Sequence, residues 1–195
     1  FPETIDKISN ELTPMVATAR LIKQEHPDAS VVFIGPCASK KLEASRRTVR
    51  SDVDFVITFE ELTGMFEAKG ILLDEIKAMD EMKDATAAGR GYGVAGGVAN
   101  AIKECIEKYY PGTPVNIQHA ESLAECKKAL LLAKAGKMNG CLIEGMACPG
   151  GCIAGAGTNI AIPVAARAVD KFKNEAEKKV PDESVDQEMV ELEKE

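Results

Sequence analysis

Short apolar runs alternate with amphipathic segments along most of this chain. The strand-like runs are residues 31–34, 53–58, 115–117 and 140–143. Segments with helical spacing of apolar residues lie around them: 3–25 with a break near Pro14, 60–69, 98–110, a segment capped by Ser122 and reaching about 135, and Pro163 to about 179. This alternation predicts an α/β fold with mostly parallel sheets flanked by helices. The length of 195 residues fits one large domain or two small lobes.

Two segments of this pattern carry a more specific prediction. The continuous apolar run 31–34 predicts a buried strand. Residues 72–91 are polar and rich in Ala and Met, and they predict a short helix followed by a mobile loop. Gly70, just before this stretch, predicts the end of the helix 60–69.

Most of the formal charge of −7 lies at the carboxyl end. Residues 181–195 contain seven acids and one Lys, a net charge of −6, which leaves −1 for residues 1–180. We therefore expect a domain over 1–180 and a solvated acidic tail over 181–195.

Because residues 1–180 have no basic excess to neutralise phosphates, we expect no binding to nucleic acid. No apolar run reaches the roughly 18–20 residues that cross a bilayer, so we expect no membrane span.

The cysteines divide into two kinds. Cys37 directly follows the first predicted strand, and Cys148 and Cys152 follow the fourth. Ligands of α/β sheets bind at the carboxyl ends of the strands, so these three thiols predict a site. Clustering in a Gly-rich turn favours metal ligation in a reducing cytosol over disulfides, and we expect a cytoplasmic protein. The remaining cysteines are expected to pack in the core: Cys105, Cys126 and Cys141.

Each cysteine motif by itself has a plain alternative. Two cysteines four residues apart in a turn of small residues can both bind one metal centre, but they can also be inert thiols in a buried turn. Cys37 has Lys40 three residues later, so a thiolate and a cation can face one anionic centre. The alternative for Cys37 is a lone reactive or buried cysteine. His26 and His119 lack metal-site spacing and are expected at the surface or in loops.

The two motifs together resemble two signatures of iron-only hydrogenases, in the same order and over nearly the whole chain. The matching residues are Pro36, Cys37, Lys40 and Glu43 in the first motif and Glu144, Met146, Cys148, Gly151 and Cys152 in the second. The segment from Tyr92 to Val98 resembles the Gly-rich segment that lines the cluster pocket of that family. Its G-x-G-x-x-G spacing has no preceding strand, so dinucleotide binding is not favoured.

The resemblance implies a role for each matching residue. Cys37, Cys148 and Cys152 would ligate a 4Fe–4S cluster. Cys152 would also bridge to a two-iron subsite with carbon monoxide and cyanide, which completes the cofactor called the H-cluster.

Other positions would surround that cofactor. Lys40 would pair with a cyanide, and Met146 would pack against the subsite. Pro36, Tyr92 and Gly93 would contribute to the pocket, and Ser9, expected in the opening helix, would relay protons. Glu43 would orient Lys40 by charge pairing, or would form an ordinary surface salt bridge.

The chain departs from the family in three ways. The family's first cysteine signature is expected upstream of Phe1, so three of the four cluster ligands are present. We therefore expect residues 1–195 alone to hold an incomplete centre, to be inactive, and to require the missing amino-terminal part. Gly35 stands where hydrogen-producing members usually have Met, and Ala156 replaces a Gly.

Four functions follow from these observations. The intact parent would interconvert dihydrogen with protons and electrons, and would exchange electrons with a ferredoxin-like carrier. Gly35 favours a hydrogen or redox sensor on the same scaffold. The cysteine signatures also occur in hydrogenase-like proteins of iron–sulfur cluster assembly, which lack the two-iron subsite. The fourth possibility is an apo structural piece with unligated thiols.

Overall fold

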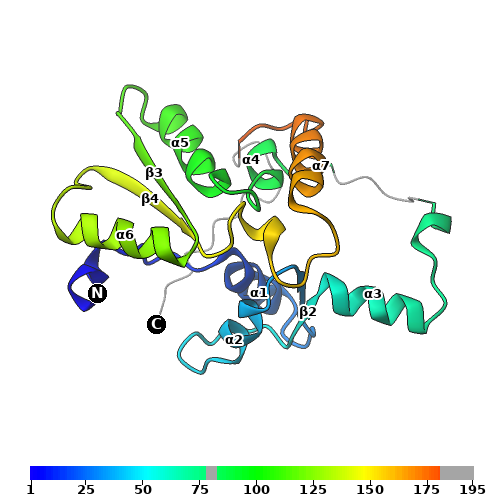
Figure 1. The fold of residues 1–195 in the computed structure, drawn as a ribbon. Helices are drawn as coiled ribbons and strands as arrows, with labels where there is room; N and C mark the ends of the chain where they lie inside the picture. Colours follow the sequence, from blue (N-terminus) through cyan, green and yellow to red (C-terminus); the bar gives the residue numbers. More distant parts are fainter. Residues whose placement is uncertain (78–82, 181–195) are drawn as a thin grey trace. The chain divides into compact units, whose positions relative to one another are not determined.

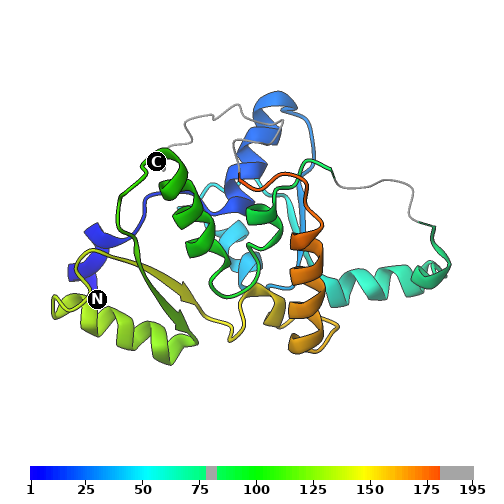
Figure 2. The same cartoon turned by 90° about the horizontal axis from the view of Figure 1, so that it is seen from above.

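The computed structural model describes residues 1–77 and 83–180. The predicted acidic tail, 181–195, lies outside the described residues. Contacts divide the chain into two compact units, which are described separately (Figures 1 and 2). Unit 1 consists of residues 1–7, 83–154 and 160–180, and unit 2 of residues 8–77 and 155–159.

Unit 1 is built around two parallel strands. Its elements are η1 (Pro2–Lys7), α4 (Ala87–Arg90), α5 (Gly97–Tyr109), β3 (Asn116–Glu121), α6 (Leu123–Lys134), β4 (Cys141–Met146), η3 (Cys152–Ala154) and α7 (Ile162–Asn174). β3 pairs with β4 in parallel, from Asn116 opposite Cys141 to Glu121 opposite Met146.

Helices cover both faces of this sheet. Adjacent residues of a strand point to opposite faces. Gly145 faces α6, where a side chain at this position would meet the Cys126 sulfur at 3.3 Å. Glu144 points the other way and contacts the first residues of α5. The α/β layering predicted from the sequence is therefore present in unit 1.

Unit 2 also contains a pair of parallel strands. Its elements are α1 (Pro14–Glu25), β1 (Val32–Gly35), α2 (Ser39–Ser45), β2 (Phe55–Thr58), α3 (Phe59–Ala68) and η2 (Leu73–Glu75). β1 pairs with β2, from Val32 opposite Phe55 to Gly35 opposite Thr58. The core of this unit joins α1 to one face of the sheet and consists of Met15, Val16, Ala19 and Val53, with Phe33 and Val56 packed against them.

The other face of the β1–β2 sheet is open. Val32, Ile34 and Phe55 share this face and are 42, 44 and 63% exposed. The prediction of a buried strand at 31–34 is therefore wrong for the described residues. α1 covers only the face that carries Phe33 and Val56, so alternate residues of the apolar run remain exposed.

The opening segment is not one helix. A short 3-10 helix, η1, ends at Lys7, and α1 begins at Pro14. Proline lacks an N–H and suits the first position of a helix, and it keeps the preceding residue extended. Thr13 accordingly has φ −66° and ψ 151°. Ser9 was expected in this helix, but it lies in the non-helical stretch between η1 and α1.

Other boundaries differ from prediction by a few residues. β3 and β4 extend beyond the predicted strands, to Glu121 and Met146. The predicted strands were too short because polar residues inside both strands interrupt the apolar pattern. α7 ends at Asn174, before the predicted end near 179. Within 72–91, predicted to contain a short helix and a loop, η2 and α4 are present, while 78–82 lie outside the described residues. Among the helices of the described residues, none has the length and apolar character needed to cross a membrane.

Candidate metal centre

The second cysteine motif forms a tight turn after β4 in unit 1. Gly150 and Gly151 have φ values of +91° and +90°, which glycine adopts without strain. The Gly151 nitrogen donates to the Cys148 carbonyl at 3.0 Å, and the short helix η3 begins at Cys152. Cys152 is exposed and Cys148 is half-buried. The glycines thus allow both cysteines to lie on one compact turn.

The Gly-rich segment predicted to line the pocket packs against this turn. The Ala95 nitrogen donates to the Gly150 carbonyl at 3.0 Å, and the Ile153 nitrogen donates to the Gly93 carbonyl at 3.2 Å. A side chain at Gly93 would begin 4.0 Å from the Cys152 Cβ. The structure therefore brings Gly93 and Cys152 together within unit 1. Figures 1 and 2 both show the loop after β4 beside the loop between α4 and α5.

Tyr92 belongs to the same segment. Its backbone nitrogen donates to the Gly89 carbonyl at 3.2 Å. Burial raises the pKa of the Tyr92 phenol above its usual value, and the negative charges of Glu144 and Cys105 raise it further. A phenol with a raised pKa keeps its proton and remains a hydrogen-bond donor over a wider pH range.

Two carboxylates hold this region: Glu121, which no motif marks, and Glu144, which belongs to the second motif but was given no role from the sequence. The Gly150 nitrogen donates to Glu121 Oε2 at 2.8 Å. Glu144 is only 8% exposed, and its oxygens accept hydrogen bonds from the nitrogens of Gly96, Val98 and Ala99. An acid in the middle of an apolar strand is the sequence signal that could have identified Glu144, since such a residue needs buried donors.

The histidine and the cysteine beside this sheet have separate environments. His119 lies on β3, where its Nδ1 is 3.3 Å from Glu144 Oε2 and its side chain is 42% exposed. Cys126 lies on α6, with its sulfur 3.6 Å from the Ala120 carbonyl oxygen. Met146, predicted to contact the cofactor, ends β4, and its carbonyl accepts from the Ser122 nitrogen at 2.8 Å.

The first cysteine motif lies in unit 2, between β1 and α2. Lys40 Nζ and Glu43 Oε2 form an ion pair at 2.5 Å, and each side chain is 22% exposed. The hydroxyl of Thr13, just before α1, donates to Glu43 Oε1 at 2.5 Å. Each oxygen of Glu43 therefore has its own partner. The sequence analysis missed Thr13, which lies thirty residues before Glu43 and carries no motif.

A short segment of unit 2 continues from the second motif. The Gly157 nitrogen donates to the Pro36 carbonyl at 2.9 Å, and the Gly157 carbonyl accepts from the Glu60 nitrogen at 3.1 Å. Asn159 Nδ2 donates to Thr63 Oγ1 at 2.7 Å on α3. Gly157 and Asn159 thus hold the segment 155–159 at the carboxyl ends of β1 and β2.

The predicted site residues fall into two sets. Unit 1 contains Tyr92, Gly93, Met146, Cys148 and Cys152, and unit 2 contains Ser9, Pro36, Cys37, Lys40 and Glu43. The Ser9 hydroxyl accepts from the Glu11 nitrogen at 3.2 Å. Within neither unit do three His, Cys, Asp or Glu side chains of the described residues gather closely enough to hold a metal ion.

The donor set nevertheless suits an iron–sulfur cluster. None of the six cysteines, all of which lie among the described residues, forms a disulfide, and cysteine thiolates are the usual ligands of such clusters. Cys148 and Cys152 come from one turn, and glycines surround them, so backbone N–H groups can approach cluster sulfurs. These residues fit the group that the cysteine motifs imply.

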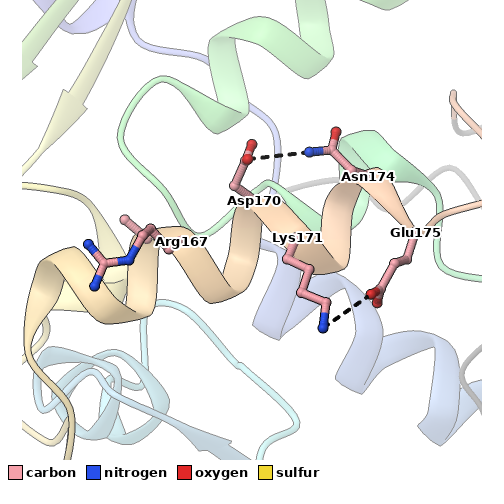
Figure 3. A pocket seen from close by; sticks show the side chains of 6 residues that line it. Arg167, Asp170, Lys171, Asn174 and Glu175 are labelled. Atoms are coloured by element: carbon pink, nitrogen blue, oxygen red, sulfur yellow. Dashed lines mark hydrogen bonds and ion pairs between the residues drawn. The ribbon is translucent and has the colours of Figure 1, made fainter.

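A surface groove elsewhere in unit 1 has a different character. Its lining residues lie on α7 and, for Glu175, directly after it: Ala166, Arg167, Asp170, Lys171, Asn174 and Glu175 (Figure 3). Lys171 pairs with Glu175 at 3.7 Å, and Asn174 donates to Asp170 at 3.3 Å. Four of these polar side chains therefore bind one another in two pairs, and the residues that line the groove include no cysteine.

Comparisons with known proteins agree with the cysteine motifs. Residues 1–156 match the family described as iron only hydrogenase large subunit, C-terminal domain. The chain is 29% identical over 213 residues to the periplasmic [Fe] hydrogenase large subunit of Nitratidesulfovibrio vulgaris, covering 88% of this chain and 50% of the relative. It is 25% identical over 198 residues to iron hydrogenase 1 of Clostridium pasteurianum, covering 80% of this chain and 34% of the relative.

A third relative is similar over a shorter stretch. The cytosolic Fe-S cluster assembly factor NAR1 of Kluyveromyces lactis is 41% identical over 64 residues, which is 33% of this chain and 14% of that protein.

The fold also has solved counterparts. A variant of the [FeFe]-hydrogenase HydA1 from Chlamydomonas reinhardtii superimposes with a TM-score of 0.65 at 20% identity, covering 94% of this chain and 65% of that one. The chain spans between a third and a half of the length of the two curated hydrogenases. Because the family match includes most of the sequence, the chain belongs to the iron-only hydrogenase large subunit family and represents its C-terminal domain.

Proposed function

We propose that this chain is the cluster-binding part of an iron-only hydrogenase that interconverts dihydrogen with protons and electrons. The observation that carries the proposal is the second cysteine motif, which is folded into a glycine turn with neither cysteine in a disulfide. Family membership supports the same conclusion. The remaining part of a longer protein and a ferredoxin-like electron carrier are the proposed partners.

The thiolates of Cys37, Cys148 and Cys152 are the proposed ligands of a 4Fe–4S cluster, and Cys152 is the proposed bridge to a two-iron subsite. When bound, this centre supplies the redox chemistry that cleaves and forms dihydrogen. Three thiolates are one fewer than a cubane cluster usually binds. We therefore expect residues 1–195 alone to hold less than one full cluster per chain.

The other site residues position and shield the centre in this proposal. Lys40 offers a cation to an anionic group, and Glu43 fixes the Lys40 ammonium at 2.5 Å. The 22% exposure of both side chains makes this pair less accessible to solvent than an ordinary surface pair. Pro36, Tyr92, Gly93 and Met146 contribute to the surrounding wall, and Ser9 is the proposed proton-relay residue.

The test uses the protein expressed from its complete reading frame and matured with the full cofactor. The expected results are hydrogen evolution with a reduced mediator and infrared bands of bound carbon monoxide and cyanide. A fully loaded protein that shows these bands but no turnover would contradict the enzymatic function and favour a sensor.

Cluster assembly is the second candidate, and the NAR1 similarity of 41% over 64 residues favours it. The two functions differ in the two-iron subsite. A protein that binds a 4Fe–4S cluster, lacks the carbon monoxide and cyanide bands after maturation, and transfers its cluster to an apo acceptor would establish the assembly function. Retention of the infrared bands would exclude it.

A further inference from the structure

We propose that Glu144 is a positioning residue for the cysteine turn, acting through the Gly-rich segment. The inference deepens the proposed function and rests on it for the identity of the bound group. Glu144 lies on β4, four residues before Cys148, and its carboxylate turns away from the turn toward α5.

The first link is the contact between Glu144 and the start of α5. Glu144 Oε2 accepts from the Gly96 nitrogen at 2.6 Å, and Oε1 accepts from the nitrogens of Val98 at 3.0 Å and Ala99 at 3.1 Å. The N-cap residue of α5 is Gly96, which has no side chain to cap the helix. A buried carboxylate from a distant strand therefore satisfies N–H groups that a local cap usually takes.

The second link is the conformation that this cap stabilises. Gly96 has φ +84°, a left-handed value that turns the chain sharply into α5. Gly97 directly follows, and a side chain there would begin only 2.1 Å from the Gly91 carbonyl oxygen. The loop before α5 is therefore folded closely on itself, and Glu144 binds the end of the loop that leads into α5.

The third link joins this loop to the cysteines. Val94 forms an antiparallel bridge with Gly151, and the Ala95 nitrogen donates to the Gly150 carbonyl at 3.0 Å. A side chain at Gly151 would come within 2.4 Å of the Ala95 nitrogen. The turn between Cys148 and Cys152 thus rests directly on backbone that Glu144 fixes.

Glu121 provides an independent anchor and a useful comparison. Its carboxylate accepts directly from the Gly150 nitrogen at 2.8 Å, within the cysteine turn itself. Loss of Glu121 should loosen the cysteine turn alone. Loss of Glu144 should loosen the start of α5 and, through the loop, the turn as well.

The experiment measures amide hydrogen exchange by mass spectrometry in the cluster-free protein expressed from its complete reading frame. Peptides that include 96–99 but not Ala95 report the start of α5, and peptides that include 148–154 report the cysteine turn. In Glu144→Gln we expect exchange in both peptides to become roughly tenfold faster or more, since an amide NH₂ replaces one acceptor oxygen. In Glu121→Gln we expect faster exchange only in 148–154.

Glu107→Gln is the matched control. Glu107 lies farther along α5, the helix that Glu144 caps, and forms an exposed pair with Lys103. It should leave both peptides unchanged. If Glu144→Gln does not fold, Ala95→Pro removes the N–H that binds Gly150 and leaves the cap intact. That variant should accelerate 148–154 alone. Unchanged exchange at 148–154, in Glu144→Gln or in Ala95→Pro, would overturn the inference.

A spectroscopic readout separates this inference from the proposed function. After anaerobic loading with iron and sulfide, the electron paramagnetic resonance spectrum of the reduced cluster should change in Glu144→Gln and stay unchanged in Glu107→Gln. An identical spectrum in loaded Glu144→Gln would also overturn the positioning role. If the wild-type protein binds no cluster, the proposed function fails, while the exchange experiment still decides whether Glu144 positions the turn.

Discussion

The backbone nitrogen of Gly157 donates a hydrogen bond to the carbonyl oxygen of Pro36 at 2.9 Å. Gly157 follows Cys152 by five residues, and Pro36 directly precedes Cys37. Within unit 2, this bond ties the segment that leaves the second cysteine motif to the loop of the first. The bond therefore fixes segment 155–159 of unit 2 against the loop that carries Cys37.

Replacing Gly157 by Ala should destabilise unit 2. The new methyl group would lie 2.4 Å from the Thr58 Cβ, which is closer than real Cβ atoms approach. Because Thr58 caps α3, we expect the free energy of unfolding to fall by about 1–3 kcal/mol, measured by thermal unfolding. The control is Gly64→Ala on α3, where a side chain meets nothing within 4 Å. The free energy of unfolding of that variant should rise by up to ~1 kcal/mol. Equal effects of the two substitutions would contradict the packing argument.

The Lys40–Glu43 pair should contribute more stability than an exposed ion pair. Glu43→Gln weakens contacts with both Lys40 and Thr13, and we expect a loss of about 1–2 kcal/mol in chemical denaturation. The comparison is Lys41→Met, which removes a pair with Glu61 whose side chains are 42 and 50% exposed. Solvent screens such an exposed pair, so its loss should affect stability less than the loss of the Glu43 contacts. Similar losses in both variants would show that the Glu43 contacts have no special strength.

Glu61 should make unit 2 sensitive to acid. The ammonium of Lys41 and the Thr58 backbone N–H lower the pKa of Glu61 from 4.5 to about 2. A carboxyl whose pKa is lower in the folded state stabilises the fold above its unfolded pKa. That contribution should be lost as pH falls from about 4.5 toward 2. The difference in melting temperature between wild type and Glu61→Gln should therefore shrink over this range, and a constant difference would contradict the assignment.

Tyr92 should make unit 1 sensitive to alkali. Burial raises the pKa of its phenol above 10.0, and the charge of Glu144 raises it further. Above pH 10 the unfolded chain releases this proton before the folded chain does, so stability should fall as pH rises. The difference in ultraviolet titration between wild type and Tyr92→Phe gives the pKa. Glu144→Gln should lower it, and an unchanged Tyr92 titration in that variant would contradict the electrostatic coupling.

The alternation of apolar runs and helical segments predicted the fold class because period and strand length are local properties. The sequence likewise predicted that Ser122 caps α6 and that Gly70 ends α3, since each residue acts within its own turn. The strands β3 and β4 were predicted too short because their polar residues find partners only in the folded chain. Glu144 is the clearest case, since its partners lie more than forty residues earlier.

The candidate site was predictable only in part for the same reason. The cysteine spacing is a local signal, and the structure places Gly93 beside Cys152. Thr13 and Glu121 act through contacts between distant segments, and no motif marks either residue. The helix expected around Ser9 failed because Pro14 starts a new helix instead of interrupting an existing one.

The central claim is that Cys37, Cys148 and Cys152 bind the same iron–sulfur cluster. Iron and sulfide content, together with the electron paramagnetic resonance spectrum, tests it directly in protein expressed from the complete reading frame and purified without oxygen. Serine at any of the three positions should remove or alter the same signal, and Cys126→Ser should leave it intact. A Cys37→Ser protein with wild-type iron content and an unchanged spectrum would contradict the claim.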